Sequence, residues 1–120
     1  MMKLHLVGDE IAKGQGVGRG STTGKTVISK TASDLEGKDL SQSIIVTNSI
    51  DESYVPYVEK AAGLITEENG ITSPSAIVGL EQGIPTIIGV ENATKELKND
   101  LLVTVDANQG RIFEGYANVL

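Results

Sequence analysis

The sequence predicts a single α/β domain in which helices cover one face of a sheet. Short β-branched runs of strand length alternate along the chain with segments of helical character, an order typical of α/β domains. The 120 residues are 39% hydrophobic, which is enough for one core. Because the chain has one Phe, three Tyr and no Trp, that core must consist of Ile, Val, Leu and Ala, which favour regular layers.

The first part of the chain is expected to be mostly β. Met2–Val7 predicts an extended segment that ends in a turn, and the glycine-dense stretch Gly14–Gly20 predicts tight turns. Two β-branched runs, Lys25–Ser29 and Ser43–Thr47, predict strands. A short helical turn is expected in the polar segment Ala32–Gln42 between them.

A first helix is predicted over Tyr54–Ala62. The run Asp51–Ser53 offers N-cap chemistry, and Pro56 is tolerable in the first helical turn, where its missing N–H has no partner anyway. Gly63 supplies the stop, and a short buried strand over Leu64–Thr66 is expected to follow.

A second helix is predicted over Ser75–Gln82, because Ser73-Pro74 before it forms an N-cap and N1 pair and Gly83 follows its end. The last two predicted strands are expected to pair as a hairpin. The remaining predicted elements are a strand at Thr86–Val90, a helical turn at Thr94–Lys98, and strands at Leu101–Asp106 and Arg111–Tyr116.

Charge and composition exclude several classes of function. The net charge of −6 and the absence of any Lys/Arg cluster argue against a nucleic-acid partner. The absence of cysteine excludes disulfides, thiolate metal sites and cysteine nucleophiles within this chain. No segment approaches the roughly 18 apolar residues that span a bilayer, so a soluble protein with no membrane partner is expected. The absence of cysteine is compatible with a reducing cytosol, and a cytoplasmic location is expected.

The glycine-rich stretch is similar to a nucleotide loop only in part. Gly20–Thr26 ends in Gly-Lys-Thr like a Walker loop, but three residues separate its glycines where the phosphate cradle needs four. The residues after Lys25 are strand-like, whereas a phosphate loop must open a helix. A structural loop that lets strands cross closely is therefore predicted, with Arg19 and Lys25 in solvent.

The single histidine, His5, is predicted to be structural. With no second histidine or cysteine nearby it cannot assemble a metal site or a catalytic triad, and no metal site is predicted. A phosphotransfer role would require His5 to be exposed beside the loop described next, and its position between Leu4 and Leu6 gives little sign of that.

The most informative segment runs from Leu64 to Gly89. It resembles the phosphohistidine swivelling domain of phosphoenolpyruvate-utilising enzymes, whose motif is Thr-x-x-Gly-Gly-x-Thr-Ser-His-x-Ala-Ile-x-Ala-Arg, then Gly-Ile-Pro and a closing Gly. The resemblance implies a swivelling β/β/α fold, with a β-rich half and helices packed on a sheet. The matching residues are Thr66, Gly70, Thr72, Ser73, Ala76, Ile77, Gly83, Ile84, Pro85 and Gly89.

The departures from this motif fall at the positions that carry the chemistry. Pro74 stands where the family places its phosphoacceptor histidine, Leu80 stands where it places an arginine, and Asn69 replaces the first glycine. The side chain of proline has no lone pair to accept a phosphoryl group, and the side chain of leucine cannot neutralise the charge of that group. We therefore expect no catalytic residue in this chain.

Three further stretches resemble the extra C-terminal domain of certain bacterial pyruvate kinases: Gly14–Gly18, Ile84–Ala93 and Val103–Ala107. The resemblance implies that residues 1–120 are one domain, excised from the C-terminus of such an enzyme, with Leu120 as the natural end. It also implies a typically tetrameric parent that transfers phosphate from phosphoenolpyruvate to ADP with Mg²⁺ and K⁺. The parent's catalytic and regulatory domains are then the partners, and this domain needs no cofactor.

Two functions remain open for such a domain. The first is a non-catalytic module for interdomain or subunit interaction and stability. The alternative is a regulatory module that binds an anion or phosphorylated metabolite at Thr72 and Ser73, because the helix beginning at Pro74 directs N–H groups and a positive dipole end into this loop. The simpler interpretation is that Ser73 only caps its helix, and Glu67 and Glu68 weaken anion affinity.

Overall fold

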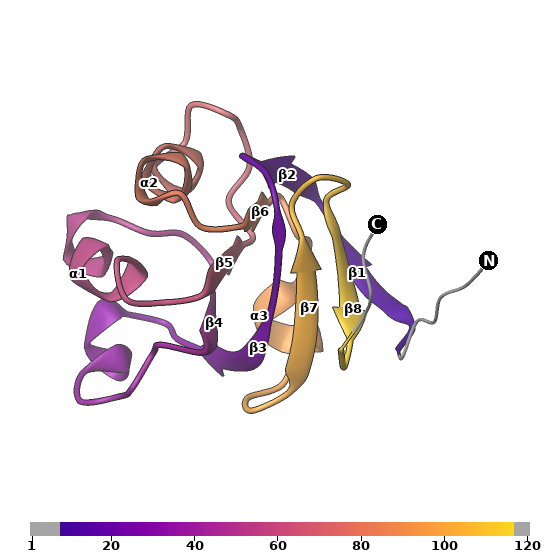
Figure 1. The fold of residues 1–120 in the computed structure, drawn as a ribbon. Coiled ribbons are helices and arrows are strands. Elements are labelled where there is room, and N and C mark those ends of the chain that lie inside the picture. Colours follow the sequence, from indigo (N-terminus) through magenta and orange to yellow (C-terminus); the bar gives the residue numbers. More distant parts are fainter. Residues whose placement is uncertain (1–7, 117–120) are drawn as a thin grey trace.

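The computed structural model describes residues 8–116, whose strands form one mixed sheet in the order β1-β8-β7-β3-β4-β5-β6-β2 (Figure 1). The pairs β3–β4, β4–β5 and β5–β6 are parallel, and the other pairs are antiparallel. The strands are β1 Glu10–Lys13, β2 Gln15–Val17, β3 Ser21–Ile28, β4 Ser43–Thr47, β5 Gly63–Thr66, β6 Thr86–Ile88, β7 Leu102–Asp106 and β8 Arg111–Glu114. The helical segments are η1 Ala32–Leu35, η2 Glu52–Tyr54, α1 Val55–Val58, α2 Pro74–Gln82 and α3 Ala93–Glu96.

Gly14 joins the two strands that end the sheet order, β1 and β2. Since β1 pairs with β8 and β2 pairs with β6, this stretch brings both edges of the sheet together. The approach is close: a Cβ on Gly14 would lie 2.3 Å from the carbonyl oxygen of Ile88, and one on Gly16 would lie 1.8 Å from that of Ala107. The predicted structural role of these glycines, allowing strands to cross closely, is confirmed.

The Walker-like run lies in a strand. Ser21 opens β3, and Lys25 is paired with Ser43 of β4 and Leu102 of β7. No helix N-terminus follows Lys25, so the geometry of a phosphate loop is missing. Arg19 and Lys25 are both exposed, as predicted.

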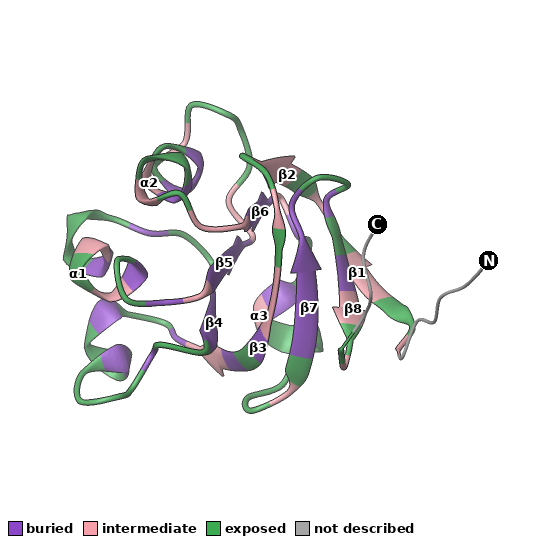
Figure 2. Ribbon diagram, viewed as in Figure 1, coloured by how far each residue is buried: buried purple, intermediate pink, exposed green. Residues whose placement is uncertain are grey.

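The central strands are covered on both faces (Figures 1 and 2). Ile45 of β4 and Leu64 of β5 pack with the η1, η2 and α1 segments, whereas Ile44 of β4 and Ile65 of β5 pack with α3 and with β7 and β8. Alternate residues of each strand therefore serve two cores, as the pleat requires. The prediction that helices cover one face is wrong for α3, which lies on the opposite face from α1 and α2.

The first helix is shorter than predicted. A 3₁₀ turn begins after Asp51, whose side chain accepts a hydrogen bond from Ser53 N–H, and α1 ends at Val58 rather than at Ala62. The reason is competition from the sheet: Ala62 N–H donates to the carbonyl of Ser43 in β4 at 2.8 Å. Gly63, predicted as the helix stop, is instead the first residue of β5.

The second helix and the hairpin follow the predictions. Ser73 caps α2, Pro74 is its first residue, and Gly83 closes it in the left-handed conformation with φ 69°. Strands β7 and β8 pair antiparallel. Met2–Val7 and His5 lie outside the described residues, so their predicted roles stay predictions.

Candidate functional site

The loop that resembles the phosphohistidine motif follows β5, at the carboxyl end of the parallel strands, where α/β proteins commonly place ligands. The chain continues the ladder beyond β5: Glu67 N–H donates to Thr47 O at 3.1 Å, and Glu68 N–H donates to Asn48 O at 2.7 Å. On the other side, Gly89 N–H donates to Glu68 O at 2.8 Å. The start of the loop is therefore anchored between the ends of β4 and β6.

Asn69, which replaces the first glycine of the motif, packs over the backbone of Gly89. A Cβ on Gly89 would lie 2.8 Å from Asn69 Oδ1, and Gly89 has φ 67°. The Asn69 Oδ1 atom also accepts the Gly70 N–H at 2.8 Å. The side chain at position 69 is accommodated because position 89 has none.

The N–H groups in the first turn of α2 donate hydrogen bonds to other groups of the same chain. Ser73 Oγ accepts from Ala76 N–H at 3.3 Å, and Ser73 O accepts from Ile77 N–H at 3.0 Å. Pro74 has no N–H, and Ser75 N–H donates to Glu68 Oε1 at 3.3 Å. The groups that would bind an anion at this helix start are thus engaged by neighbouring side-chain and main-chain oxygens.

Glu68 supplies the negative charge at this helix start. Its Oε1 also accepts a hydrogen bond of 2.5 Å from Ser75 Oγ, and Ser75 is fully buried. The positive end of a helix dipole stabilises a carboxylate there as it would a phosphate. Of the two predicted anion-binding residues, Thr72 is exposed and Ser73 is half-buried, and the carboxylate of Glu68 binds the same helix turn.

The side chain of Glu67 forms hydrogen bonds with α3, on the face of the sheet opposite to α2. Its Oε2 accepts from Thr94 N–H at 2.8 Å and from Thr94 Oγ1 at 2.7 Å, and its Oε1 accepts from Asn48 Nδ2 at 2.6 Å. Burial raises the pKa of Glu67, but the hydrogen bonds from Thr94 and Asn48 and the charge of Lys95 outweigh burial and leave the pKa below its ordinary value of 4.5. This carboxylate is a structural anchor for α3.

Sequence reasoning assigned Glu67 and Glu68 only a weakening effect on anion affinity. Their partners, Thr94 and Ser75, lie 27 and 7 residues further along the chain. No local spacing rule links such pairs, because the contacts depend on how the helices sit on the sheet. The only general rule that points to these roles is that acidic side chains are favourable near the N-termini of helices.

The two positions that carry the family's chemistry lie at the surface of α2. Pro74 is exposed, and Leu80 has 61% of its surface exposed. The loop from Asn69 to Ser75 contains no histidine, cysteine, lysine or carboxylate. Its hydroxyl groups can donate and accept hydrogen bonds, but none of its side chains has a basic nitrogen that could store a phosphoryl group.

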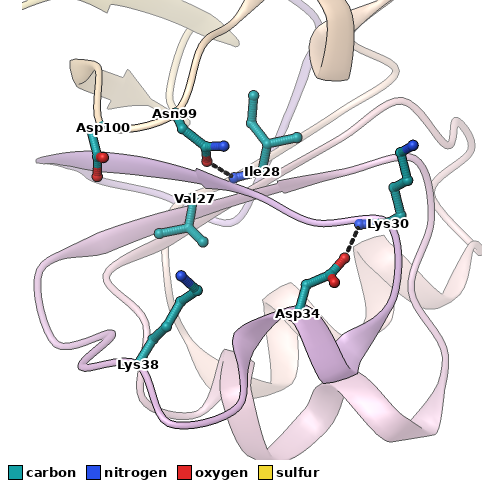
Figure 3. Close-up of a pocket in the computed structure, with 7 residues that line it drawn as sticks. All are labelled: Val27, Ile28, Lys30, Asp34, Lys38, Asn99 and Asp100. Atoms are coloured by element: carbon teal, nitrogen blue, oxygen red, sulfur yellow. Dashed lines mark hydrogen bonds between the residues drawn. The ribbon is translucent and has the colours of Figure 1, made fainter.

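A separate cleft of about 570 Å³ lies near the end of β3 (Figure 3). Asp34 Oδ2 accepts from Lys30 N–H at 2.8 Å, and Asn99 Oδ1 accepts from Ile28 N–H at 2.7 Å. The backbone hydrogen bonds from Lys30 and Thr31 lower the pKa of Asp34. The cleft has no net charge to select an ion, because two lysines and two aspartates are among its lining residues, Val27, Ile28, Lys30, Asp34, Lys38, Asn99 and Asp100.

Over residues 8–116, no three His, Cys, Asp or Glu side chains are grouped so that they could hold a metal ion. In the same part of the chain, every helix is too short or too polar to cross a bilayer.

Comparison with known proteins gives the same family as the motif does. Residues 40–110 match the family described as "PEP-utilising enzyme, mobile domain". Over 120 residues the chain is 81% identical to a pyruvate kinase of Staphylococcus haemolyticus (strain JCSC1435) and 74% identical to one of Staphylococcus aureus (strain USA300). All of this chain is covered, but only 20% of each relative, so the chain spans about a fifth of their length.

Solved structures confirm the predicted fold class. The holo-form of Thermococcus kodakaraensis aconitase X matches with a TM-score of 0.66 at 21% identity, over 88% of this chain and 98% of that one, which shows the fold alone. The solution structure of Enzyme I (nEIt) matches with a TM-score of 0.52 at 28% identity, over 72% of this chain and 33% of that one. The resemblance carried by Leu64–Gly89 is thus confirmed.

Proposed function

Because this chain belongs to the PEP-utilising enzyme mobile domain family, we propose that it is a non-catalytic accessory domain of a pyruvate kinase. In this proposal the domain lies at the C-terminus of a cytoplasmic, homotetrameric parent that transfers phosphate from phosphoenolpyruvate to ADP. The domain contacts the parent's catalytic and regulatory domains and stabilises the assembly. The identity of 81% over the whole chain to a pyruvate kinase supports this parentage.

The Mg²⁺ and K⁺ used by such a parent are proposed to bind outside this chain. Hard cations need several oxygen ligands that converge on one point. The described residues offer no cluster of three acidic or histidine side chains, and Glu67 and Glu68 are each engaged with a different helix. The chemistry of the donor set therefore supports a domain without a cofactor.

One observation carries the proposal that the domain has no phosphotransfer activity: the α2 turn presents Pro74 in place of a nucleophile and already binds the carboxylate of Glu68. A phosphorylated histidine at this place would bring negative charge to the turn at which Glu68 already accepts the Ser75 N–H. Leu80 offers no charge to stabilise it.

The experiment incubates the purified chain with phosphoenolpyruvate or ATP and follows its intact mass. We expect no added phosphoryl group, with a family member that keeps the histidine as the positive control. A phosphorylated species would refute the proposal.

The accessory role is tested on the whole pyruvate kinase with and without residues 1–120. We expect the shortened enzyme to unfold at a lower temperature or to dissociate more readily, because contacts between domains stabilise only the intact chain. Identical thermal unfolding, oligomeric state and kinetics would contradict this role.

A second candidate function is regulation by an anion or phosphorylated metabolite at Thr72 and Ser73. The observation in its favour is the exposed Thr72 hydroxyl beside the capped start of α2. The carboxylate of Glu68 at the same turn disfavours it. Calorimetry with sugar phosphates and nucleotides separates the two functions, since only the regulatory one requires heat of binding.

A further inference from the structure

Exposed apolar side chains gather at α2. Ile77 has 47% of its surface exposed and Leu80 has 61%, and Ile71, in the loop that leads into the helix, has 67%. Residues three apart on a helix are neighbours, so exposed Pro74, Ile77 and Leu80 form one row. Figure 2 shows that α2 carries exposed residues on one side and buried residues on the other.

An apolar cleft of about 420 Å³ continues this row. It lies between α2 and the η2–α1 segment and shares Pro74 and Ile77 with the row. Its lining residues are Ile50, Asp51, Glu52, Val55, Pro74, Ile77 and Val78. We call the cleft together with Pro74, Ile77 and Leu80 the α2 surface.

We propose that the α2 surface binds an apolar segment flanked by Lys or Arg residues, supplied by the part of the pyruvate kinase polypeptide that lies outside this chain. The inference rests on the proposed function and assigns the contact to one face of the domain. A contiguous exposed apolar patch is typical of an interaction site.

The length of the relatives favours this occupant. The chain covers only 20% of the pyruvate kinases it matches, so about four fifths of their polypeptide lies outside it. A covalently linked segment has an effective concentration in the millimolar range for a short flexible linker, which makes a modest apolar contact sufficient.

Charge determines which residues flank the segment. Asp51 and Glu52 lie at the cleft, and Glu81 is exposed on α2 next to Leu80. Hydrogen bonds from the Ser53 side chain and N–H lower the pKa of Asp51, so its carboxylate is charged at neutral pH. A basic partner complements this rim, whereas a second copy of the chain, with its net charge of −6, would bring like charges together.

The test compares amide hydrogen exchange of α2 in the whole pyruvate kinase and in the chain of residues 1–120. We expect exchange at Ile77–Gln82 to be about tenfold slower in the whole enzyme, because docking opposes local opening. The double variant Ile77→Asn/Leu80→Asn should remove this protection in the whole enzyme. Leu102→Asn is the matched control, since Leu102 is an exposed leucine on β7 with 42% of its surface exposed.

Glu52→Lys gives a second measurement that leaves the apolar residues unchanged. Glu52 is exposed, and reversing its charge should repel the basic flanks and lower the protection of α2 several-fold. The same variant in the isolated chain should leave the exchange of α2 unchanged, which shows that the fold is intact.

Equal exchange of α2 in the two proteins would overturn the assignment. Dimerisation of the isolated chain that Ile77→Asn/Leu80→Asn abolishes, measured by sedimentation, would also overturn it in favour of a second copy. If α2 is unprotected while removal of residues 1–120 still destabilises the enzyme, only the surface assignment fails. If that removal changes nothing, the accessory role itself fails.

Discussion

Glu68 Oε1 accepts hydrogen bonds from both the N–H and the Oγ of Ser75, at 3.3 and 2.5 Å. The preceding residue, Glu67, accepts hydrogen bonds from the N–H and Oγ1 of Thr94. Two consecutive carboxylates at the end of β5 therefore hold the N-termini of α2 and α3, which lie on opposite faces of the sheet. Both layers of the domain are attached at this one point.

Replacing Glu68 by Ala should destabilise the chain. Ser75 is fully buried, so the variant leaves its Oγ and N–H without their partner, at a cost of about 1–3 kcal/mol in the free energy of unfolding. Urea denaturation measures the change. Glu81→Ala, at an exposed carboxylate of the same helix, should stay within about 0.5 kcal/mol of the parent. Equal effects of the two variants would mean that the Ser75 contact does not stabilise the fold.

Glu67 should make stability depend on pH in the acidic range. Its pKa is lowered in the folded chain, so its contribution is fully present above the ordinary value of 4.5 and is lost as the pH falls through the lowered value. Glu67→Gln should reduce the loss of stability on acidification, as measured by thermal unfolding from pH 7 downward. Glu59→Gln, at an exposed site, is the control. An unchanged slope in Glu67→Gln would contradict the role of this carboxylate.

Pro74→His restores an imidazole but leaves Glu68 at the same helix turn. We expect this variant to accept a phosphoryl group slowly from phosphoramidate, a chemical donor, because the carboxylate repels the incoming anion. Adding Glu68→Gln should raise the rate roughly tenfold, equivalent to about 1.4 kcal/mol. Mass spectrometry over time gives both rates, with Pro74→Gln as the unreactive control. The hypothesis that Glu68 opposes an anion fails if the two rates are equal.

Gly16→Ala should disturb the closure of the sheet. The new Cβ would lie 1.8 Å from the carbonyl oxygen of Ala107, so the backbone must move, at a cost of about 1–3 kcal/mol. The neighbouring substitution Gln15→Ala, at an exposed position in β2, should change the unfolding free energy by less than about 0.5 kcal/mol. Chemical denaturation of both variants is sufficient, and a neutral Gly16→Ala would show that β2 shifts freely.

The predictable elements are those whose signals are local. Four of the five residues of β4, Ile44–Thr47, are β-branched, and the residues that cap α2, Ser73 and Gly83, lie directly before and after it in the sequence. The same locality explains the motif, because Leu64–Gly89 is continuous in sequence. The sequence alone therefore shows that Pro74 occupies the position of the family's histidine.

The remaining features depend on residues far apart in the chain. The end of α1 at Val58 reflects the bond from Ala62 N–H to Ser43 O, a contact that propensities do not include. The position of α3 on the far face depends on how Ala93 and Leu97 pack into a core built by other strands. The end of α1 and the position of α3 are therefore determined by contacts with the rest of the sheet and not by their own sequences.

The join at Gly14 also has a consequence for the order of folding. β1 pairs with β8, whose residues 111–114 lie about a hundred positions later in the chain, so this part of the ladder has a very high contact order. On a ribosome, β1 emerges early and its partner emerges late. Both edges of the nascent sheet therefore remain open until β8 is released, which makes this interval the one in which the chain is most exposed to wrong pairing.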